Sequence, residues 1–108
     1  MNIKDMIKDI HYNAVKHGWW EEHRSFGDII ALCHSELSVA LEEYRKGNKP
    51  DIVYYEGLKP EGIPVELADV VIRIMDYCGY VGIDLEKVII DKHEYNKLRP
   101  YKHGGKVI

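Results

Sequence analysis

The sequence contains no hydrophobic run approaching the roughly 20 residues of a membrane span, so we expect no membrane partner. Its N-terminal residues mix charges into an apolar pattern, which argues against a signal peptide. Cysteine is scarce. Cys33 and Cys78 each lie within an apolar helical pattern, which favours two reduced core thiols over a disulfide. We therefore expect a cytoplasmic protein.

Common cofactor motifs are also missing. The six histidines are scattered, without a His-x-x-x-His or Cys-x-x-Cys pair, so a zinc site is not expected. The sequence has neither a phosphate-binding P-loop nor a dinucleotide fingerprint. Its 108 residues, 45% hydrophobic and 31% charged, suffice for one globular domain, and we assign residues 1–108 to that domain.

A strongly basic balance is absent too, because the formal net charge is −3. This argues against nucleic acid as a partner, since non-specific binding to it needs a basic surface. The charge is unevenly distributed. Residues 92–108 carry five basic residues and one acidic residue, whereas residues 1–91 carry ten basic and seventeen acidic residues. An acidic body is thus followed by a basic segment that includes the tail, residues 100–108.

Apolar residues recur at helical spacing in four segments, and no segment shows sustained strand alternation. Asn2 suits the N-cap position of the first helix, which ends at Gly18. The second helix opens with a capping box formed by Ser25 and Asp28 and stops near Gly47. The first two predicted helices therefore have both ends marked in the sequence.

The third predicted helix starts around Pro64 and closes at Gly82, and the fourth runs from its cap, Asp84, to about Leu98. Before the third helix, residues 47–63 hold three glycines and two prolines with little periodicity. We expect these residues to form a long loop, which in so small a domain is usually functional or mobile. The pattern predicts an all-α fold, a four- to five-helix bundle.

The third predicted helix is apolar on nearly all sides between Val65 and Tyr77, so it should be buried centrally or at a subunit interface. At about 100° per residue, its charged residues fall within an arc of roughly 80°. They are Glu66, Asp69, Arg73 and Asp76. Three carboxylates therefore share one stripe of a helix that is otherwise apolar.

Two acids of the second helix match this stripe. Glu36 and Glu43 are seven residues apart and point nearly the same way, and antiparallel packing would bring Glu36 opposite Glu66 and Asp69. Crowded carboxylates that offer only oxygen ligands suit Mg²⁺ or Mn²⁺. In such sites the ion keeps bound waters, and substrate phosphates join its coordination when they bind. The alternative is a solvated helix face on which Arg73 pairs with Asp69.

Several short segments follow one another in a recognisable order. They are Glu36-Leu-Ser-Val39, Glu66-Leu-Ala-Asp69, Gly82-Ile-Asp-Leu85, and then Lys92, Asn96 and Arg99. From about residue 29 to 106 the sequence resembles the MazG-type nucleotide pyrophosphohydrolases, in the short single-domain form of bacteria and phages. The family motif is Glu-x-x-Glu, a loop and Glu-x-x-Asp, followed by Lys-x-x-x-Asn-x-x-Arg on the last helix.

The resemblance implies an all-α fold of the MazG-like type, assembled as a homodimer or homotetramer. It implies Mg²⁺-dependent hydrolysis of a nucleoside or deoxynucleoside triphosphate to the monophosphate and pyrophosphate, as a house-cleaning activity. The metal-binding and catalytic residues it implies are Glu36, Glu66 and Asp69, and the substrate-binding residues are Lys92, Asn96 and Arg99.

One position departs from the family motif, because Val39 stands where the second glutamate is expected. Glu43, one helical turn further along, is the candidate replacement as metal ligand and catalytic acid, and Glu42 fits less well. If neither residue replaces the missing glutamate, the alternative is a catalytically impaired MazG-like protein that binds nucleotide or a partner without turnover.

Two further features are candidates for substrate binding. Lys102, in the basic tail, offers a cation to the phosphates, although such a tail also serves as a frayed terminus that aids solubility. Trp20, next to Trp19, offers a platform for a nucleobase, although neighbouring aromatic residues also serve packing.

Overall fold

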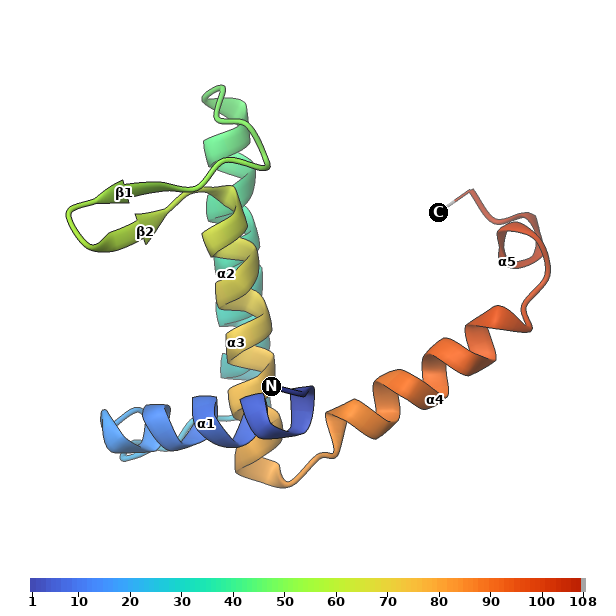
Figure 1. The fold of residues 1–108 in the computed structure, drawn as a ribbon, viewed down its shortest axis with the longest axis horizontal. Helices are drawn as coiled ribbons and strands as arrows, with labels where there is room; N and C mark the ends of the chain where they lie inside the picture. Colours follow the sequence, from blue (N-terminus) through green and yellow to red (C-terminus); the bar gives the residue numbers. More distant parts are fainter. Residues whose placement is uncertain (108) are drawn as a thin grey trace.

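The computed structural model describes residues 1–107, apart from the side chains of residues 102 and 103, and it is mostly helical (Figure 1). The helices are α1 (Ile3–Lys16), α2 (Phe26–Arg45), α3 (Ile63–Val81), α4 (Leu85–Lys97) and the single-turn α5 (Lys102–Gly105). Two short strands, β1 (Tyr54–Glu56) and β2 (Lys59–Glu61), lie between α2 and α3. Within residues 1–107, no helix is long and apolar enough to cross a membrane. The predicted helical class is thus confirmed, with one small sheet added.

The helices begin and end at the residues that the sequence marks for this purpose. Asn2 and Asp84 each accept a hydrogen bond from a backbone N–H in the first turn of the helix that follows. Ser25 and Asp28 form the reciprocal capping box of α2. Gly82 ends α3 in the left-handed conformation, with φ +81°, which a glycine adopts without steric cost.

The long helices α2 and α3 run antiparallel, side by side, and α1 lies across the C-terminal half of α3 (Figure 1). Where α1 crosses α3, a small core forms from Ile7, Met75 and Cys78. Gly79 allows this crossing, because a Cβ there would lie 2.6 Å from the Cβ of His11. Cys33 and Cys78 are both buried free thiols, as predicted.

Part of the predicted 47–63 loop is ordered as a β-hairpin, which the sequence pattern did not indicate. The strands β1 and β2 pair antiparallel, with Tyr54 opposite Glu61 and Glu56 opposite Lys59. Strands of three residues that are almost wholly exposed are too short to show an alternating pattern. The hairpin places Glu61, the last residue of β2, directly before α3.

Helix α4 and the tail extend away from the other helices (Figure 1). The start of α4 is anchored, because Leu85 packs against the core at the α1–α3 crossing and Lys4 forms an ion pair with Asp84. Beyond this anchor, none of the residues of α4 is buried, and large apolar side chains such as Val88 and Ile90 are exposed. One chain therefore leaves much of its apolar surface uncovered.

Candidate functional site

Three of the predicted acids converge between α2 and α3. One carboxylate oxygen from each of Glu36, Glu66 and Asp69 lies within 4.8 Å of the other two, and all three residues are half-buried. The convergence follows from local structure: Glu66 and Asp69 are one turn apart on α3, and the antiparallel α2 presents Glu36 to the same point. The placement predicted for these acids is confirmed.

Glu36 and Glu66 perturb each other's ionisation. Their carboxyl groups are hydrogen-bonded, which raises the pKa of Glu66 to about 7 and lowers the pKa of Glu36. Burial and the nearby negative charges raise the pKa of Glu66 further in the same direction. Of the two, Glu66 is therefore the carboxyl group that is protonated as the pH falls below about 7, and it then donates the hydrogen bond to Glu36.

Arg73 supplies the cation of this cluster. Its Nη2 donates a hydrogen bond to Oε1 of Glu36 at 3.0 Å, so Arg73 pairs across the helices rather than with Asp69 on its own helix. Burial raises the pKa of Asp69, and the positive charge of Arg73 opposes that rise. Arg73 thus pairs directly with Glu36 and acts through its charge on Asp69.

A second acid cluster adjoins the first and shares Glu66 with it. One oxygen from each of Glu43, Glu61 and Glu66 lies within 4.8 Å of the other two. Oε2 of Glu43 is buried and has no hydrogen-bond partner among the described residues, while the hydroxyl of Tyr54 donates to its Oε1 at 3.5 Å. Glu43, the predicted replacement for the acid missing at Val39, therefore reaches the site.

Glu61 is the site residue that sequence reasoning missed. It ends β2, directly before the N-cap of α3, and it forms an ion pair with Lys59 at 2.8 Å. No periodic pattern identified it, because it lies in a segment without helical spacing and only the hairpin turns it toward Glu66. The nearest signal in the sequence is its position five residues before Glu66.

The donor set fits a hard divalent cation. The five acids of the two clusters offer only carboxylate oxygens, which is the ligand type that Mg²⁺ and Mn²⁺ take in proteins. The buried, unpartnered oxygen of Glu43 marks a point where a ligand would satisfy an otherwise costly polar atom. Val39 lies 43% exposed on α2 and has no oxygen to contribute. Glu42 is exposed and paired with Arg45, as its poorer predicted position suggested.

A cavity of about 730 Å³ opens beside the first cluster, between α1 and the α2–α3 pair. Asp69 and Arg73 belong both to the cluster and to the wall of this cavity. Trp19 also lines it, with the guanidinium of Arg24 stacked 3.5 Å from the centre of its ring. The cavity therefore combines apolar surface with charged groups, as small-molecule sites commonly do.

Trp20, the predicted platform for a base, is engaged in packing. Its ring stacks on Tyr80 with centroids 3.9 Å apart, and its Nε1–H donates to Oδ1 of Asp76 at 3.0 Å. Nδ1 of His11 lies 2.8 Å from the same oxygen. Asp76, which shares the charged stripe of α3, is thus held in a buried network at the α1–α3 crossing. Trp19, rather than Trp20, faces the cavity.

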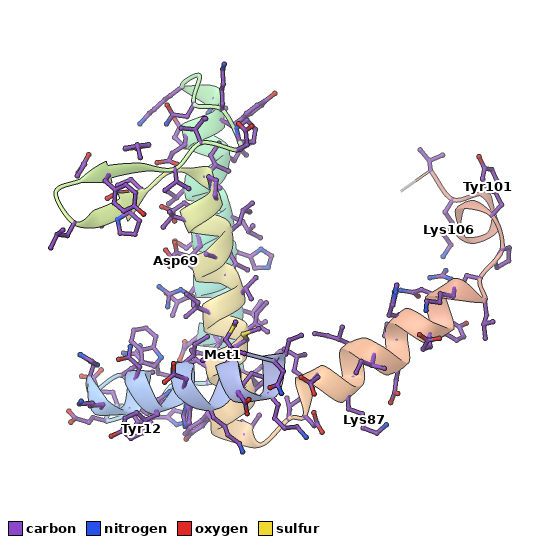
Figure 2. All side chains as sticks on the ribbon, in the orientation of Figure 1. Met1, Tyr12, Asp69, Lys87, Tyr101 and Lys106 are labelled. Carbon is purple, nitrogen blue, oxygen red and sulfur yellow. The ribbon has the colours of Figure 1, made fainter. Side chains whose placement is uncertain are left out.

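The predicted phosphate-binding residues lie apart from the acids within this chain. Lys92 and Asn96 are on the exposed part of α4, and Arg99 follows its end. Figure 2 shows Asp69 on α3 and Lys106 far along the arm that leads away from it. Lys102 begins α5, but its side chain lies outside the described part of the structure. The acids converge within one chain, whereas the basic set does not join them there.

No family model, curated protein or solved structure matches the chain. The fold and the site are therefore interpreted from their own geometry.

Proposed function

We propose that this protein is a metal-dependent hydrolase that cleaves a nucleoside or deoxynucleoside triphosphate to the monophosphate and pyrophosphate. The observation that carries the proposal is the convergence of Glu36, Glu66 and Asp69 in a cluster from which Asp69 also lines a neighbouring cavity. The partly buried acids repel one another, and Arg73 pairs directly only with Glu36, which favours a further cation at the cluster. The resemblance of the acid motif to the MazG-type enzymes supports the same reaction.

Each part of the site has a separate task in this reaction. Glu36, Glu66 and Asp69 hold Mg²⁺, and Glu43 with Glu61 extends the oxygen ligand set on the side where Val39 lacks one. The ion supplies charge neutralisation on the phosphate oxygens and acidifies a bound water. The cavity beside Asp69 holds the nucleoside, which aligns the phosphates with the acids.

The bond changes are those of a simple displacement. A water oxygen attacks the α-phosphorus while the bond from that phosphorus to the bridging oxygen breaks, and pyrophosphate leaves with that oxygen. One carboxylate of the clusters orients the water and accepts its proton. Arg73 stays paired with Glu36, which keeps that carboxylate ionised and in position.

Pyrophosphate release from a panel of ribo- and deoxyribonucleoside triphosphates, with Mg²⁺ or Mn²⁺, tests the proposal. We expect turnover that requires the ion and falls at least 100-fold in the Glu66→Gln and Asp69→Asn variants. Glu42→Gln is the matched control, because Glu42 lies on α2 but is exposed and paired with Arg45. Absence of turnover with every nucleotide, despite metal-dependent nucleotide binding, would leave the non-catalytic binding function in its place.

The variant Val39→Glu tests whether other residues replace the glutamate that the family motif has at position 39. If Glu43 and Glu61 supply the ligands, Val39→Glu changes activity little, whereas Glu43→Gln and Glu61→Gln each reduce it. A large gain of activity in Val39→Glu would instead locate a defect at position 39 and favour the binding function for the natural sequence.

A further inference from the structure

The hairpin brings a lysine to the edge of the acid clusters. Nζ of Lys59 lies 2.8 Å from Oε1 of Glu61, and the side chain of Lys59 is 75% exposed. A carboxylate has two oxygens, so Glu61 can keep this ion pair and still offer an oxygen to the cluster that it forms with Glu43 and Glu66. Lys59 is therefore a solvent-accessible positive charge directly beside the acids.

The register of the hairpin places Lys59 on the face that meets the site. Successive side chains of a strand point to opposite faces, so Lys59 shares a face with Glu61, two residues further along β2, while Pro60 points the other way. Tyr54 is paired directly opposite Glu61 and lies on the same face, and its hydroxyl donates to Glu43. The face of the hairpin that carries Lys59 is thus the face turned toward the acids.

The charge of Lys59 also acts on acids other than its direct partner. Burial raises the pKa of Asp69, and the positive charge of Lys59 is among the influences that oppose this rise. Glu61 raises the pKa of Lys59 most strongly, and the charge of Glu66 acts on it in the same direction. Both acid clusters therefore lie within the electrostatic reach of this one lysine.

The cavity, the acids and Lys59 follow one another along α3. The cavity lies between α1 and the middle of this helix, whereas the hairpin joins its N-terminal end (Figure 1). Arg73 borders the cavity, and Glu66 belongs to the cluster on the hairpin side. These two residues are seven apart, which is about 10 Å along a helix and comparable to an extended triphosphate. A nucleoside in the cavity, with its phosphates on the acids, therefore directs the far end of the phosphate chain toward the hairpin.

We propose that Lys59 is a substrate-binding residue that contacts the terminal phosphates, which leave together as pyrophosphate. The assignment rests on the proposed function, because the cavity and the acids set the direction of the substrate. An ammonium group suits this task, since it has three donors and forms charge-assisted hydrogen bonds to phosphate oxygens. Its charge also stabilises the negative charge that develops on the leaving pyrophosphate. Lys59 thereby favours triphosphates over diphosphates, which offer it one phosphate fewer.

A purely structural role for Lys59 would be to hold Glu61 in position. The two roles predict different changes in metal affinity when Lys59 is replaced by glutamine. If Lys59 only orients Glu61 as a ligand, the affinity for Mn²⁺ falls in this variant. If Lys59 binds phosphate, its replacement removes a positive charge that repels the ion, so the affinity for Mn²⁺ stays the same or rises slightly.

Calorimetric titration of the Mn²⁺-saturated protein with imidodiphosphate, a pyrophosphate analogue with a bridging nitrogen, tests the contact without reference to activity. Lys59→Gln should weaken this binding ~10-fold without weakening Mn²⁺ binding, and Lys59→Arg should retain most of the affinity because it keeps the charge. Lys49→Gln is the matched control, since it removes an exposed lysine of the same 47–63 segment and should change neither affinity. Binding of a nucleoside monophosphate, which has no terminal phosphates, should be the same in Lys59→Gln and the wild type.

Turnover provides a second measurement. Lys59→Gln should lower kcat/KM for nucleoside triphosphates ~10-fold and for the corresponding diphosphates less, so that the preference for triphosphates shrinks. Lys49→Gln should leave both values of kcat/KM unchanged.

The possible outcomes separate this inference from the proposed function. Undiminished binding of imidodiphosphate by Lys59→Gln would overturn the inference and leave the proposed function standing. A loss of that binding that only follows a loss of Mn²⁺ affinity would also overturn it, because Lys59 would then act through Glu61. A wild-type protein that binds neither Mn²⁺ nor imidodiphosphate would count against the proposed function and, with it, against this role of Lys59.

Discussion

Binding of a divalent cation to the acid clusters should weaken steeply as the pH falls below neutrality. Glu66 has a pKa of about 7 in the ion-free chain, because it is hydrogen-bonded to Glu36, partly buried and close to other carboxylates. Metal ligands must be deprotonated, so the ion has to displace the proton of Glu66. The apparent association constant then follows the ionised fraction of Glu66 and falls ~30-fold between about pH 8 and pH 5.5.

Isothermal titration calorimetry with Mn²⁺ measures this effect directly. Repeating the titration near pH 7 in two buffers of different ionisation enthalpy should reveal release of about half a proton per site filled. The Glu66→Gln variant should bind more weakly and lose this part of the pH dependence, whereas Glu42→Gln should retain both. Affinity that stays constant between pH 8 and pH 6, or binding without proton release, would refute the raised pKa of Glu66.

The same proton affects the stability of the ion-free chain. The pKa of Glu66 is higher in the folded state than its ordinary value of 4.5, so the folded state binds the proton more tightly. The stability that this proton provides is complete at pH values below 4.5 and is lost as the pH rises through about 7. Thermal unfolding should therefore show Mg²⁺ stabilising the protein more at pH 8 than at pH 5.5.

Three substitutions test other parts of the structure. Gly79→Ala should destabilise the fold by about 1–3 kcal/mol in urea unfolding, because the added Cβ would lie 2.6 Å from a side-chain atom of α1. The control is Gly27→Ala, which meets only ordinary contacts and should be neutral or slightly stabilising. Ser25→Ala should cost about 1 kcal/mol through loss of the α2 cap, and an unchanged unfolding midpoint would contradict the capping box. Glu61→Gln should weaken Mn²⁺ binding in calorimetry, whereas Glu56→Gln, at the exposed end of β1 next to the hairpin turn, should not, and equal effects would remove Glu61 from the site.

The parts of the fold that could be predicted are those fixed by local chemistry. Ser25, Asp28 and Asp84 mark helix ends because a side-chain oxygen meets backbone N–H groups two or three residues away, and this requires no knowledge of the rest of the chain. Glu66 and Asp69 were found for a similar reason, because helical spacing alone places them one turn apart. Helices and their charged stripes are therefore readable from a single sequence.

What could not be predicted depends on contacts between distant segments. Glu61 joins the site only because a hairpin of three-residue strands turns it there, and no periodicity reports so short a pairing. Trp19 and Trp20 are neighbours, yet one lines the cavity and the other packs on Tyr80, because the turn after α1 directs them differently. The direction of α4 likewise depends on the turn after Gly82 and on what covers the apolar side of the helix.

Gly62 connects the hairpin to α3, and it couples the hairpin to the acid cluster. Its φ is +117°, and a Cβ there would lie 2.5 Å from the backbone oxygen of Ile52, so only glycine fits between Glu61 and the helix that carries Glu66. Because this connection is one residue long and closely packed, the hairpin cannot open without withdrawing Glu61 from the site. Filling the site should therefore slow amide hydrogen exchange along residues 52–62, and the hairpin becomes a reporter of metal occupancy.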